Sequence, residues 1–186
     1  MCEYCGCQAL ASIAALTAEH DQIVTMLGQA RALLDGGDVA GAARVARRVT
    51  RVLGPHTVVE EQGLFPALVD DFPDHVERLR EQHRHVEAVL DEADVVLAHA
   101  VNESSGGSLD GSVDGAALAG WPGRLRAAST LLRDHILAEQ DGVFPAALAI
   151  LSPQQWAEVD GVRASVGSGL TGESGRGRHR DHRHEY

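Results

Sequence analysis

The sequence predicts an all-α fold: an up-down-up-down bundle of four long helices, followed by a short fifth helix. Apolar residues recur at intervals of three and four along four long segments, as they do on one face of an amphipathic α-helix. Ala, Leu and Val dominate the apolar residues and only 4% of the chain is aromatic, which favours helices over a β-sandwich. The first three segments are separated by short turns, so neighbouring helices are expected to be antiparallel.

The first expected helix runs from about Gln8 to Asp35, and Gly36-Gly37 ends it. The second runs from about Val39 to Val69 and contains Gly54-Pro55. Proline inside a helix removes one hydrogen bond and clashes with the preceding turn, so a kink is expected just before His56.

The third expected helix follows Phe72-Pro73 and runs from Asp74 to about His99. Asn102 to Gly120 is rich in Gly, Ser and Asp, which predicts a flexible loop. The fourth helix is expected from about Trp121 to Ile150. Ser152-Pro153-Gln154-Gln155 then supplies a cap residue, Pro at the first position and Gln at the third, so a short fifth helix is expected to begin there.

The chain is expected to consist of four parts. Residues 1–9 form a Cys-rich N-terminal segment, residues 10–151 the bundle, and residues 152–166 the short helix. Residues 167–186 are rich in Gly, Arg and His and are expected to be disordered.

The formal net charge of -11 argues against nucleic acid or an anionic membrane as a partner, because both require a basic surface. No stretch reaches the ~18 consecutive apolar residues of a membrane-spanning helix. Residues 1–7 lack the basic and apolar regions of a secretory signal, so a cytoplasmic location is predicted. The sequence leaves the oligomeric state open.

Four histidines lie on the apolar faces of the expected helices, one in each helix: His20, His56, His83 and His135. A single buried histidine is usually a hydrogen-bonded core residue. Burying four imidazoles in one core without partners would be costly, however, and a metal site explains all four at once.

A repeated motif strengthens this interpretation. The segment 56–67 resembles the segment 135–146, with His, Glu, Gly, Phe, Pro and Ala at matching places. The spacing of four residues puts Glu60 on the same helical face as His56, and Glu139 on the same face as His135, about 6 Å apart along the axis. This arrangement suits two metal ions lying side by side, with carboxylates able to bridge them. Counting residues from each turn places all the candidate ligands at one level of the bundle.

The order His, His-x3-Glu, His, His-x3-Glu, with Phe-Pro after each motif, resembles the hemerythrin-like (HHE) cation-binding domains over about Leu10 to Leu151. The resemblance implies an oxo- or hydroxo-bridged di-iron centre with two irons per chain. By the same resemblance, Glu60 and Glu139 would bridge the irons, and the four histidines would be terminal ligands.

The sequence departs from the oxygen-carrying hemerythrins at two places. They have a second His one turn after the His of the third helix, where this chain has Glu87. Their last carboxylate is an Asp five residues after the final His, whereas here it is Glu139, four residues after. Glu87 is therefore either a seventh ligand or a solvated surface carboxylate.

Other polar residues are weaker candidates. Glu61 is expected in the second shell or on the surface, His85 is expected to face solvent, and His75 and His99 lie at helix ends. The cluster Cys2-x2-Cys5-x-Cys7 is either a soft-metal or redox site or a thiol-bearing terminus, and it is not expected to ligate the bundle metals. Three histidines of the tail could also donate nitrogen ligands: His179, His182 and His184.

Three classes of function remain. The first is a di-iron protein that binds or turns over O2, NO or peroxide, with peroxidase- or oxidoreductase-type chemistry. The second is an oxygen, iron or redox sensor that signals through a partner. The lack of a recognisable output domain argues against this class. The third is iron storage or ferroxidase activity, but ferritin-like sites use Glu-x-x-His motifs instead. Carboxylate-rich ligation favours ferric iron, so a redox or detoxifying role is predicted rather than oxygen transport.

Overall fold

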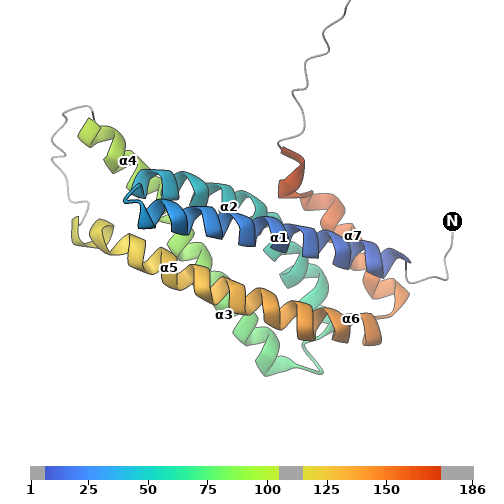
Figure 1. Ribbon diagram of the computed structural model, residues 1–186. Helices are drawn as coiled ribbons and strands as arrows, with labels where there is room; N and C mark the ends of the chain where they lie inside the picture. Colours follow the sequence, from blue (N-terminus) through green and yellow to red (C-terminus); the bar gives the residue numbers. More distant parts are fainter. Residues whose placement is uncertain (1–6, 105–114, 173–186) are drawn as a thin grey trace, which may run out of the picture.

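The computed structural model describes residues 7–104 and 115–172, which are all-helical apart from short turns. The order is α1 (Cys7–Asp35), α2 (Val39–Val59), the π-helix η1 (Glu60–Leu64), the 3-10 helix η2 (Phe65–Ala67), α3 (Pro73–Asp91), α4 (Ala93–Ser104), α5 (Gly115–Ala138), the π-helix η3 (Glu139–Val143), α6 (Phe144–Ile150), α7 (Pro153–Val166) and the 3-10 helix η4 (Gly169–Gly172). Figure 1 shows the long helices gathered into a bundle, with α1 beside α2 and α5. Among the described helices, none combines the length and the apolar character needed to span a bilayer.

The expected first turn is confirmed. α1 ends at Asp35, and Gly37 takes a positive φ of 80° that reverses the chain. The carboxylate of Asp38 accepts a hydrogen bond of 2.6 Å from the backbone N–H of Gly41 and so caps the start of α2.

The second and fourth expected helices each change type at a glutamate. α2 passes through Pro55 without interruption, and η1 begins at Glu60; α5 gives way to η3 at Glu139. In each π segment the backbone N–H of the following phenylalanine bonds to the glutamate carbonyl five residues before it. The next residue in both places is proline, which has no backbone N–H to donate. Both helices therefore widen at the same point of the repeated motif, directly before Phe-Pro.

The third expected helix is divided at Glu92 into α3 and α4. Both ends of the expected loop from 102 to 120 are helical, because α4 continues to Ser104 and α5 already begins at Gly115. The middle of that expected loop, residues 105–114, lies outside the described residues. Trp121, which we expected to start the fourth helix, lies inside α5 and donates an indole N–H to the carbonyl of Val89, 3.0 Å away. This bond joins α5 to α3.

The short fifth helix is confirmed as α7, and its capping box forms. The hydroxyl of Ser152 accepts a hydrogen bond from the N–H of Gln155, whose side chain accepts one from the N–H of Ser152. Figure 1 shows α7 alongside the early part of α1, and the hydroxyl of Ser12 bonds to Asp160 there.

The chain stays packed beyond the expected start of the disordered tail. η4 lies against α2, where Gly169 comes so close to the backbone of Arg51 and Val52 that a Cβ atom would not fit. Leu170 packs against the core. Packing against the core therefore continues as far as Leu170, and residues 173–186 lie outside the described part of the chain.

Two apolar clusters fill the bundle, and His20, His56 and His83 each fall between members of the two clusters along their helices. The first cluster contains Ile23 and later residues of α1, and the second contains Leu16. α2 contributes Leu53 to the first, and Val59 belongs to the second. His20 and His56 fall between these pairs in sequence. The polar residues thus form a layer that is closed off from water on both sides.

Candidate metal centre

Four histidines and two glutamates meet in this layer. One histidine comes from each of the helices α1, α2, α3 and α5. The two glutamates are the first residues of the π-helices η1 and η3. All six side chains are at most 2% exposed: His20, His56, Glu60, His83, His135 and Glu139. The prediction that these residues gather at one level of the bundle is confirmed.

Each glutamate contacts one histidine of its own helix and one from another helix. Glu60 Oε1 lies 3.2 Å from His56 Nε2, and Glu60 Oε2 lies 3.4 Å from His83 Nε2. Glu139 Oε1 lies 3.1 Å from His135 Nε2, and Glu139 Oε2 lies 3.2 Å from His20 Nε2. The two copies of the repeated motif therefore make the same pattern of glutamate–histidine contacts.

The potential ligand atoms form two groups, and within each group they lie within 4.8 Å of one another. The first contains His20 and His56 and the second contains His83 and His135; Glu60 and Glu139 belong to both. Because the carboxylates are shared, the groups are adjacent compartments of one site.

The buried polar atoms of the centre that lack hydrogen-bond partners are consistent with a bound cation. Both carboxylate oxygens of Glu60 and of Glu139, together with Nε2 of His83 and of His135, are buried and have no hydrogen-bond partner among the described residues. Buried polar atoms normally find partners, and six unpartnered atoms pointing at one place would be very costly. Nitrogen and oxygen donors in this number suit a transition-metal ion. The cluster could therefore bind metal.

The model of one protein family matches the chain: the hemerythrin HHE cation-binding domain, over residues 11–147. The chain belongs to this family. No curated protein and no solved structure gives a match. The family assignment and the buried His/Glu cluster agree that this hemerythrin domain binds metal cations.

Three histidines of the hemerythrin centre are oriented by a second polar side chain. Nδ1–H of His56 donates to Glu19, 3.0 Å away, and Nδ1–H of His83 donates to Glu61, also 3.0 Å away. Nδ1–H of His135 donates to the side-chain oxygen of Gln82 at 2.9 Å. When Nδ1 keeps its proton and Nε2 has none, each ring directs the lone pair of Nε2 into the centre, as a metal ligand must. Glu61 thus contacts a candidate ligand while its side chain remains 33% exposed.

Glu19 was not predicted from the sequence. It is fully buried, and besides His56 it accepts hydrogen bonds from Arg163 at 2.9 and 2.8 Å and from Ser168 at 2.6 Å. Arg163 lies in α7, and Ser168 lies between α7 and η4. Arg163 and Ser168 are more than 140 residues from Glu19 in the sequence, so no local spacing signals their association.

The repeated phenylalanines also serve the centre. The ring of Phe144 stacks on His20 at a centroid distance of 5.5 Å, and Phe65 stacks on His83 at 6.0 Å. Each phenylalanine thus covers a histidine from a different helix. This explains why the motif repeats Phe as well as His and Glu.

The electrostatics of the centre favour positive charge. Burial alone would lower the pKa of His56, but the charge of Glu60 and the hydrogen bond to Glu19 outweigh it and raise that pKa to about 10. Burial would likewise raise the pKa of Glu60, yet His56 and His83 hold it well below its usual value. Burial and the charge of Glu60 push the pKa of Glu139 upward, but the nearby rings of His135 and His20 leave it lowered. Protons and a metal cation therefore compete for the same buried nitrogens.

The remaining predicted residues lie elsewhere. Glu87 belongs to neither group of ligand atoms; it is half-buried, and burial raises its pKa although the charge of His83 opposes this. His85 is exposed, as expected. Cys2, Cys5 and the tail histidines (His179, His182 and His184) lie outside the described residues, and Cys7 is the first residue of α1.

Proposed function

We propose that this hemerythrin domain is an up-down-up-down four-helix bundle that holds two iron ions side by side. His20 and His56 would hold one ion, His83 and His135 the other, and Glu60 and Glu139 would bridge the pair. One observation supports this most directly: two groups of buried ligand atoms share both carboxylates. A single ion would use only one group and leave the remaining histidines unpartnered in the core.

Bound iron would supply one-electron redox chemistry and open positions for small ligands. The chain contributes orientation and exclusion of water. Glu19, Glu61 and Gln82 hold three imidazoles in place. Phe65 and Phe144 stack on the rings of His83 and His20. The apolar clusters on both sides of the layer keep bulk water away from the centre. A small, uncharged molecule is therefore the ligand best suited to reach it.

We further propose that the domain reacts with O2, NO or peroxide in a redox or detoxifying role rather than transporting oxygen. The support comes from the balance of ligands. Two anionic carboxylates reach both groups, and a third, Glu87, lies close enough to act on the charge of His83. Negative charge near the ions stabilises the ferric state, so ferrous iron should be oxidised readily instead of binding O2 reversibly.

The test is to load the protein anaerobically with ferrous iron, measure iron per chain, and mix it with air while recording the visible spectrum. We expect about two irons per chain and prompt conversion to a stable ferric spectrum. Peroxide and NO should each be consumed by the ferrous protein. Oxygen uptake that is fully recovered under vacuum would contradict the detoxifying role, and binding of one iron per chain would contradict the two-ion site.

A further inference from the structure

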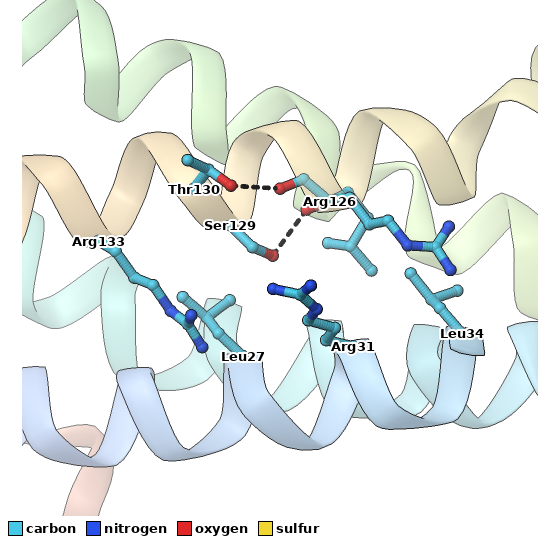
Figure 2. Close-up of a pocket in the computed structure, with 8 residues that line it drawn as sticks. Leu27, Arg31, Leu34, Arg126, Ser129, Thr130 and Arg133 are labelled. Carbon is cyan, nitrogen blue, oxygen red and sulfur yellow. Dashed lines mark hydrogen bonds between the residues drawn. The ribbon is translucent and has the colours of Figure 1, made fainter. Parts of the chain in front are cut away.

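A cleft of about 170 Å³ opens between α1 and α5, away from the candidate metal centre. Its apolar surface comes from Leu27, Leu34 and Leu125. Figure 2 shows Arg133 reaching from α5 toward α1 and Arg31 reaching from α1 toward α5, so that both guanidinium groups lie in the gap between the two helices. The cleft thus combines an apolar floor with cationic walls.

The positive charge of the cleft is only partly balanced. Arg126 donates to Asp35 at 2.9 Å, and Arg31 lies 3.9 Å from the same carboxylate. Among the described residues Arg133 has no ion-pair partner, and its Nε is buried without a hydrogen-bond partner. Three guanidinium groups therefore face one carboxylate, in a chain whose formal net charge is -11. A buried N–H donor without a partner costs free energy, which a ligand could recover.

The two hydroxyl groups of the cleft do not serve as donors. Ser129 donates its proton to the carbonyl of Leu125 at 2.6 Å, and Thr130 donates its proton to the carbonyl of Arg126 at 3.2 Å, as Figure 2 shows. The guanidinium groups are left as the donors directed at a ligand. Planar guanidinium groups pair best with carboxylates and phosphates, often through two parallel hydrogen bonds.

We propose that this cleft binds a small organic anion, with an apolar body on the leucines and a carboxylate held by Arg133 and Arg31. The volume suits such a ligand, since an apolar cavity of about 150 Å³ is large enough for benzene. None of the residues that line the cleft belongs to the centre described above, so the proposal does not depend on the identity of the metal.

The experiment is calorimetric titration of the iron-loaded full chain with three probes. Benzoate has both the ring and the charge, benzamide keeps the ring without the charge, and inorganic phosphate keeps a charge without the ring. We expect saturable binding of one benzoate per chain, with benzamide and phosphate each binding at least about tenfold more weakly. The visible spectrum should stay constant during the titration, because the cleft residues are not iron ligands.

Arg133→Gln and Arg31→Gln should each weaken benzoate binding about tenfold. Arg31 is 68% exposed, so its variant tests the site without endangering the fold. Arg44→Gln is the matched control: Arg44 is an exposed residue of α2, and its loss changes the net charge equally. Equal affinity for benzoate and benzamide would overturn the proposal. So would an equal loss of affinity in the Arg44→Gln variant, or a benzoate-dependent change in the iron spectrum that survives both cleft substitutions.

Discussion

The guanidinium group of Arg163 donates two hydrogen bonds, of 2.9 and 2.8 Å, to the buried carboxylate of Glu19. Glu19 in turn accepts the Nδ1–H of His56, and the hydroxyl of Ser168 completes its set of partners. Through these bonds α7 and the segment that follows it control the position of a candidate metal ligand on α2. α7 is therefore part of the support of the centre.

Arg163→Gln should destabilise the protein by about 2–3 kcal/mol, because it leaves a buried carboxylate with only part of its hydrogen bonds. It should also weaken metal binding by about tenfold or more, since His56 loses its firm orientation. Denaturant unfolding measures the first effect and metal competition the second. Arg84→Gln is the control: Arg84 and its partner Glu77 are exposed, and its loss should change neither quantity appreciably. An Arg163→Gln variant with unchanged metal affinity would show that α7 supports only the fold.

His56→Ala and Glu139→Ala should lose most of the bound iron. Each substitution removes a member of the ligand groups and leaves its partners unpaired in a buried layer, so stability should fall as well. Iron per chain by elemental analysis measures the loss. His85→Ala changes an exposed histidine of α3 and should keep full iron. If the two ligand variants retain full iron and the parent spectrum, the assignment of the centre is wrong.

Metal binding should release protons at neutral pH. The pKa of His56 is raised from 6.5 to about 10 in the folded protein, so a proton must leave before Nε2 can bind a cation. Metal affinity should therefore increase as the pH rises from about 6.5 toward 10. The same proton stabilises the metal-free fold fully below about pH 6.5, and this contribution is lost as the pH rises through about 10.

Calorimetry with Zn2+, which has no redox chemistry, tests this prediction in buffers of different ionisation enthalpy. The heat should depend on the buffer at pH 7, and the proton count should fall in a His56→Gln variant. A heat independent of the buffer would contradict the prediction.

Glu87→His should slow oxidation of the ferrous protein by air. Glu87 is a half-buried carboxylate near His83, and its replacement by a neutral imidazole removes negative charge that favours ferric iron. Stopped-flow absorbance measures the rate. Glu81→His, which changes an exposed carboxylate on the same helix, provides the control. Equal oxidation rates in the parent and the Glu87→His variant would show that Glu87 does not influence oxidation of the iron.

Replacing Cys2, Cys5 and Cys7 together by serine should leave iron binding in the bundle unchanged. Cys7 starts α1, thirteen residues before His20, which corresponds to about 20 Å along a helix. Iron content and the visible spectrum of the triple variant check this. A loss of bundle iron would mean that the cysteines contribute to the centre.

The sequence by itself determined the helical segments and the six residues that meet in the core. Helical periodicity fixes His56 relative to Glu60, and His135 relative to Glu139, within one turn, so these pairs can be predicted from spacing alone. It also places His20 and His83 on apolar faces, which must turn inward to bury their leucines and valines. The cap of α7 is equally local, because Ser152 and Gln155 are three residues apart.

Only the tertiary structure decided what surrounds those six residues. The break at Glu92 and the ordered turn at Gly169–Gly172 depend on packing between helices, and neither leaves a pattern in neighbouring residues. The same holds for Glu19, whose buried charge is stabilised by an arginine and a serine from the far end of the chain. A buried carboxylate needs partners in three dimensions, and their distance along the chain has no bearing on whether they can supply the hydrogen bonds.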